Sequence, residues 1–184
     1  LKTSENMTQA ELKTNLADKL QRVAEFLEAV AEADWHRSQN GKWTIGQEFE
    51  HLRMSTQGMA FLLSVANRPN WRPTDRTSRE YQAFLSEYQA AIAAIRDRLP
   101  NNPAAPSVES DALTVAQQAQ RWAKTTQQVL GVFDSLAEPE LEGSTVWKHP
   151  LLGPVTAREV LYFTTFHTQH HHGSMVRKLT YETK

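Results

Sequence analysis

Residues 8–30 read TQAELKTNLADKLQRVAEFLEAV. Thr8 is followed three positions later by Glu11, which is the spacing of a capping box at the start of a helix. Apolar side chains then recur every three or four residues, at Leu12, Leu16, Leu20, Val23, Leu27 and Val30. The stretch predicts a long amphipathic helix that continues to about residue 35, and its apolar face needs other helices to cover it.

Further helices are predicted along the rest of the chain. The same apolar spacing recurs over residues 44–67, 77–99, 110–137 and 156–179. Two of these segments begin with a capping-box pair, Thr44 with Gln47 and Thr156 with Glu159. Five amphipathic helices in one chain favour a bundle that buries the apolar face of each helix.

The connections between these helices are predicted to be irregular. Residues 100–106 hold three prolines and predict a stiff linker, after which Ser110 or Asp111 is expected to cap the fourth helix. Residues 68–77 and 139–154 read as loops, and no strand is predicted. The fold class is therefore all-α: one domain over residues 1–184, with a four-helix core and an additional helix between the second and the penultimate helix.

Composition excludes several classes of function. The net charge is −1, with no basic patch to bind a nucleic acid, and no apolar run approaches the roughly 20 residues that span a bilayer. The chain has no cysteine, so disulfides, thiolate ligands and a cysteine nucleophile are excluded. We expect a cytoplasmic protein without a nucleic-acid or membrane partner.

The histidines are concentrated near the C-terminus, within residues 166–173, FHTQHHHG. His167 and His171 stand four positions apart, so one lies above the other on a helix, in the stripe that faces the bundle. Two imidazoles inside a core need a reason, because burying unpaired polar groups is costly. Metal ligation is one reason, and hydrogen bonds to buried water or carboxylate are another. A solvated histidine run and a fragment of an expression tag are the competing interpretations.

A metal site of this kind generally needs a third protein ligand. His51 is the best candidate, because it flanks the apolar stripe of the second predicted helix. His149 lies in a predicted loop before Pro150, where a turn role is equally consistent, and His36 is expected in solvent. The spacing of the residues does not choose among the three.

Three motifs, in order, resemble those of the DinB-like superfamily, which includes the YfiT-like bundles and bacterial thiol-dependent S-transferases. Residues 42–52, KWTIGQEFEHL, are similar to its W-S/T-x-x-E/Q-x-x-x-H-L signature. Residues 149–156, HPLLGPVT, resemble its H-P-x-x-G-x-L-T lead-in, and residues 167–173 resemble its H-x-x-H-H-x-G-Q motif. The resemblance covers roughly residues 8–180 and implies a metal-binding four-helix bundle.

The resemblance also implies a ligand set. Carried over by motif position, the metal ligands are His51, His167 and His171, and His170 matches a middle histidine that is usually not a ligand. At His172 and Ser174 the chain departs from the commoner Arg and Gln, which leaves any substrate role of these positions open. The implied cofactor is a divalent metal ion, with zinc or nickel first and iron or manganese next.

Several functions fit such a site. The resemblance implies a transferase in which a low-molecular-weight thiol, supplied from outside the chain, attacks an electrophile. A metal-dependent hydrolase is the alternative, with Glu48, one turn before His51, as a candidate base or supporting group; an exposed surface glutamate is the competing interpretation. A non-catalytic metal-binding or stress-related module, and a homodimeric scaffold with vestigial histidines, also stay open.

Overall fold

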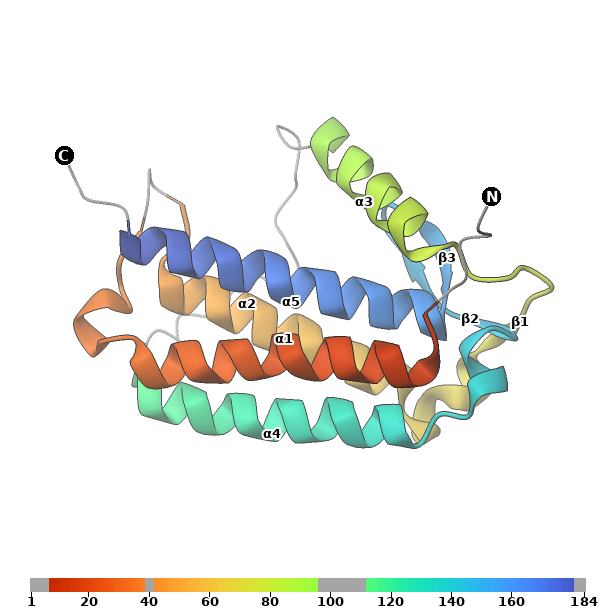
Figure 1. Cartoon of the computed structure of the whole chain (residues 1–184), viewed down its shortest axis with the longest axis horizontal. Coiled ribbons are helices and arrows are strands. Elements are labelled where there is room, and N and C mark those ends of the chain that lie inside the picture. Colours follow the sequence, from red (N-terminus) through yellow and green to blue (C-terminus); the bar gives the residue numbers. More distant parts are fainter. Residues whose placement is uncertain (1–6, 39–41, 96–111, 181–184) are drawn as a thin grey trace.

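Four long helices form the core of the bundle. The computed structural model describes residues 7–38, 42–95 and 112–180. The core helices are α1 (Gln9–Ala29), α2 (Ile45–Leu63), α4 (Val115–Asp134) and α5 (Ala157–Thr180). Both α4 and α5 pack against α1 and α2, so α1 and α2 occupy diagonal corners of the bundle (Figure 1). The prediction of an all-α bundle is confirmed.

Each core helix begins with a reciprocal capping box. The predicted pairs are present at Thr8, Thr44 and Thr156, where the threonine hydroxyl accepts from a backbone N–H three residues on and the side chain at that position accepts in return. Thr114 makes a fourth such cap at the start of α4. Such caps satisfy N–H groups that the helix itself leaves without acceptors, and so fix where each helix starts.

Some predicted helix boundaries are wrong. The first helix ends at Ala29 and is followed by a separate turn of 3₁₀ helix at Glu32–Asp34, and the second ends at Leu63 rather than residue 67. The fourth begins at Val115, because Thr114 supplies the cap that was expected from residue 110 or 111. Those two residues and the predicted linker at 100–106 lie outside the described residues.

The additional helix lies where it was predicted, between α2 and α4 in the chain. It is α3 (Tyr81–Ile95), which packs on α5 and stands away from the other core helices (Figure 1). Aromatic rings make this contact: Tyr81 meets Tyr162 of α5 edge-on, and Tyr88 meets Phe163 and Phe166 in the same way. α3 therefore covers a part of α5 that the other core helices leave open.

A small antiparallel sheet corrects the prediction that the chain has no strand. β1 (Arg72–Pro73), β2 (Ser144–His149) and β3 (Gly153–Thr156) are hydrogen-bonded in that order. The β2–β3 turn is closed by Gly153, whose positive φ of 68° is easily adopted only without a side chain. Pro154 is tolerated because β3 is an edge strand, where a missing N–H breaks no ladder.

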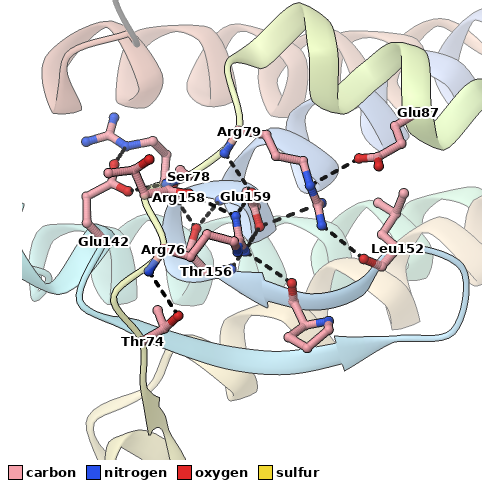
Figure 2. A network of polar contacts seen from close by, with 12 residues as sticks. Thr74, Arg76, Ser78, Arg79, Glu87, Glu142, Leu152, Thr156, Arg158 and Glu159 are labelled. Carbon is pink, nitrogen blue, oxygen red and sulfur yellow. Dashed lines mark hydrogen bonds and ion pairs between the residues drawn. The ribbon is translucent and has the colours of Figure 1, made fainter.

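A buried carboxylate connects the sheet, the segment before α3 and the start of α5. Glu159 is fully buried and accepts two hydrogen bonds from the Arg76 guanidinium, at 2.7 and 2.8 Å. It also accepts from the backbone N–H groups of Arg79 and Thr156 (Figure 2). Arg158, the neighbour of Glu159, pairs with Glu142 just before β2. These contacts fix the direction in which α5 leaves the sheet.

No described helix is both long enough and apolar enough to cross a membrane.

Candidate metal centre

Three histidines from two helices meet inside the bundle. His51 comes from α2, and His167 and His171 come from successive turns of α5. His51 Nε2 lies 3.2 Å from His167 Nε2, and His171 Nε2 lies 3.1 Å from the same atom. Packing of α2 against α5 thus brings together the three residues that the sequence motifs indicated.

The spacing of these nitrogens suits a small divalent cation. With metal–nitrogen bonds of 2.0–2.1 Å, two ligands of a tetrahedral ion are separated by about 3.3 Å. Every pair of ligand atoms in the cluster lies within 4.8 Å, and two of the pairs are near the tetrahedral value. The residues present therefore fit a metal bound through three imidazoles.

The rings of the cluster are held by aromatic neighbours. Phe163 stacks on His167, with ring centroids 5.0 Å apart and 21° between the planes. Trp43, just before α2, packs on His51 at 5.0 Å. Burial, reinforced by the neighbouring histidines, lowers the pKa of His167 well below its usual value. His167 is therefore neutral at physiological pH, which is the state in which imidazole binds a metal.

A carboxylate supports His171 from the side opposite its ligand atom. His171 Nδ1 lies 2.9 Å from Glu48 Oε1, and the Lys178 ammonium pairs with the other carboxylate oxygen. Burial alone would raise the pKa of Glu48, but hydrogen bonds with His171, Lys178 and Ser174 outweigh it and lower the pKa to about 2. An ionised carboxylate accepts a hydrogen bond from His171 Nδ1–H, and this contact directs Nε2 of the same ring at the other histidines.

This finding corrects the interpretation of Glu48 as an exposed surface residue, because it is 5% exposed. The Glu48 carboxylate supports His171 and not His51, which is one turn away on the same helix.

The sequence analysis did not identify Lys178, which is also buried. Its signal was available: Lys178 follows His171 by seven positions, so both lie on the inward stripe of α5.

Comparison with known families places the chain. The sequence profile of the DinB superfamily matches residues 15–175, which is most of the chain. The chain belongs to the DinB superfamily. A comparison with curated proteins found no match at a stringent threshold.

The remaining histidines of this DinB-superfamily chain are outside the cluster. His149, at the end of β2, is not near enough to serve as a third ligand, and its Nδ1 accepts from the backbone N–H groups of Leu151 and Leu152 in the β2–β3 turn. Burial, with a contribution from Arg79, lowers its pKa to about 4. Of the two possibilities left open for His149, the turn role is the one present. His36 is exposed, as expected.

His170 and His172 lie on different faces of α5 from His167 and His171, outside the tri-histidine cluster. His170 is exposed and stacks on Phe166 at 6.0 Å, and His172 meets Phe26 of α1 edge-on. Partial desolvation of the two rings lowers the pKa of both imidazoles, and neighbouring cationic groups add to the effect. The histidine run of the DinB motif is therefore divided: two members belong to the cluster and two do not.

Proposed function

We propose that this chain holds a divalent metal ion at His51, His167 and His171 and activates a low-molecular-weight thiol for transfer to an electrophile. The observation that carries the proposal is the convergence of three imidazole Nε2 atoms at the spacing a metal requires. Membership of the DinB superfamily, which is metal-binding, supports it. Zinc and nickel are the proposed ions, since both accept imidazole ligands.

The residues of the chain have distinct parts in this proposal. The three imidazoles hold the ion, and the ion, when bound, lowers the pKa of a thiol that coordinates it. Glu48 keeps the proton on His171 Nδ1, and Phe163 and Trp43 keep the rings in position. The thiol must come from outside, because the chain has no cysteine. Its sulfur forms the new bond to the electrophile as the bond between the electrophile and its leaving group breaks, and the thiol proton passes through solvent to that leaving group.

Hydrolysis of an ester or amide is the second candidate. It would use the same three ligands, and a general base beside the attacking water would assist it. Glu48 was the candidate base, but both of its oxygens are engaged, by His171 and by Lys178. The occupied carboxylate therefore favours thiol transfer over hydrolysis.

We propose the cytoplasm as the location of either reaction, since low-molecular-weight thiols are kept reduced there.

Metal analysis of two histidine variants tests the site. His51→Ala removes one of three ligands and is expected to lower the metal content of the purified protein sharply. His36→Ala is the matched control, because His36 is exposed and outside the cluster. Equal metal in the two variants would remove the tri-histidine site from consideration.

Turnover is tested separately, with the metal-loaded protein, a panel of low-molecular-weight thiols and a chromogenic electrophile. Thiol transfer predicts product formation that depends on the metal and is lost in His51→Ala. Ester hydrolysis without thiol consumption would favour the second candidate. Metal bound at full occupancy with neither activity would identify a non-catalytic metal-binding module.

A further inference from the structure

A groove of about 680 Å³ is lined by residues of α1, α3 and α5. α5 forms its floor, and α1 and α3, which flank α5 in Figure 1, contribute its two walls. None of His51, His167 and His171 lines it. The volume is within the range of about 300–1,000 Å³ that small-molecule sites occupy. The groove is therefore large enough for a ligand of its own.

The two walls of the groove differ in chemistry. Lys19 and Arg22 of α1 lie on one side, and Arg177 extends the positive charge along the α5 floor. Tyr81 and Leu85 of α3 lie on the other side, and Phe166 of α5 adds a third apolar surface. No Asp or Glu is among the lining residues. The groove thus combines a cationic side with an apolar, largely aromatic side.

Arg177 is the cation most available to a ligand. Lys19 and Arg22 already bind Asp18, at 2.8 and 3.0 Å, so their charge is partly neutralised. Arg177, by contrast, forms no ion pair with another residue in the described part of the chain. Its guanidinium lies against Gly173, one turn earlier on α5, where a Cβ would come within 3.3 Å of Nη1. The missing side chain at Gly173 lets Arg177 lie along the floor of the groove.

We propose that this groove binds a small organic anion with a flat apolar body. The anionic group pairs with Arg177, assisted by Lys19 and Arg22, and the flat body packs on Tyr81, Leu85 and Phe166. An arginine guanidinium binds a carboxylate through paired hydrogen bonds, and aromatic surfaces favour a flat apolar partner. The groove and the tri-histidine cluster share no residue, so we expect a ligand to bind here without the metal.

The remaining lining groups suit such a ligand. His170 and His172 line the groove, and their ring nitrogens can form hydrogen bonds with a ligand. The side-chain amides of Gln82 and Gln169 provide further donors. These positions include His172, where the chain departs from the commoner residue of its motif.

Calorimetric titration of the full chain with 2-naphthoate tests the proposal. Titration with the neutral analogue 2-naphthalenemethanol measures the part of the binding free energy that is due to the ring alone. The naphthoate is expected to bind roughly tenfold more tightly than the alcohol, because the alcohol has no carboxylate and cannot form the charge-assisted pair of hydrogen bonds with Arg177. Arg177→Gln is expected to remove that difference. High salt should weaken the binding of naphthoate only.

Arg72→Gln is the matched control, since Arg72 is exposed on β1 and does not line the groove. Titrations are run on metal-free and metal-loaded protein, and equal affinity is expected in both. Three results would each overturn the proposal: equal affinity for the anion and the alcohol, equal loss in the Arg72 and Arg177 variants, or binding that requires the metal. The last would assign the carboxylate to the metal cluster instead.

Discussion

At the scale of single residues, the metal cluster depends on groups that do not touch the metal position. Glu48 illustrates this dependence, because it contacts His171 through the ring nitrogen that faces away from the cluster. Its second oxygen is held by Lys178, so the carboxylate has one fixed orientation. Groups of this kind orient the ligand and fix its tautomer.

Replacing Glu48 by Gln is expected to weaken metal binding by about 10–100-fold, the usual effect of losing such a supporting group. All three histidines remain in this variant, so the site is weakened rather than removed. Competition with a chelator of known affinity measures the change. Glu50→Gln is the matched control: Glu50 is also buried on α2 but pairs with Arg53 and Arg121, not with a histidine. A similar loss in both variants would mean that damage to α2 is the cause.

Much of this site could be predicted from the sequence, and the parts that could not are long-range. His167 and His171 are marked by their four-residue spacing, and the motif around His51 indicates the third position. The helical period places Lys178 on the inward stripe of α5, but Lys178 and Glu48 are 130 residues apart, and no local pattern indicates that they pair. For Glu48, an exposed surface position competed with a role as base or supporting group; packing of α5 against α2 buries it.

At the scale of elements, the start of α2 is fixed by the turn before it. Trp35 is almost completely buried, and its carbonyl accepts from the N–H of Gly46 at 3.0 Å. Gly46 is also where the indole comes closest to α2: a Cβ there would lie 2.5 Å from Trp35 Nε1. Since the indole ring is enclosed by close-packed neighbours, it cannot move away from an added Cβ.

Gly46→Ala is therefore expected to destabilise the protein by about 1–3 kcal/mol, the usual cost of overpacking a core. Gly58→Ala is the control in the same helix, where a Cβ meets nothing within 4 Å. It is expected to stabilise the protein by up to about 1 kcal/mol, because alanine is the better helix former. Urea unfolding of both variants measures the two effects. Equal changes in the free energy of unfolding of the two variants would show that helix propensity, and not the contact with Trp35, determines the effect of alanine at Gly46.

The elements themselves were predictable to different degrees. The predicted capping boxes at Thr8, Thr44 and Thr156 are present, because caps and apolar period are local properties of the chain. The sheet was missed because its strands are short, and because Pro150 and Pro154 suggested a loop. β1 pairs with β2 across some seventy residues, a contact that no local pattern encodes.

At the scale of the whole molecule, Glu159 connects parts of the chain that are far apart in sequence. Burial alone would raise the pKa of this carboxyl, but the Arg76 guanidinium and the backbone N–H groups of Arg79 and Thr156 outweigh it and lower the pKa. A carboxyl whose folded pKa lies below its unfolded value of about 4.3 stabilises the fold above that pH. The contribution is lost as the pH falls through the folded pKa.

Glu159→Gln is expected to lower the free energy of unfolding by about 1–3 kcal/mol at neutral pH, since the hydrogen bonds lose their charge. The difference from the wild type should shrink as the pH falls below about 4.3. Unfolding measured from pH 7 down to acid checks both statements. Glu28→Gln, at an exposed position of α1, should show neither effect. A deficit that stays constant with pH would mean that packing, not charge, is lost.

The division of the three histidines between α2 and α5 also determines when the proposed metal site can form. A growing chain that has been synthesised only as far as α4 contains His51 but neither of its partners. The site is complete only after α5 has been made and has packed against α2. In the proposed metal-binding function, the ion would therefore be acquired only after α5 has packed against α2, by chains that have already folded.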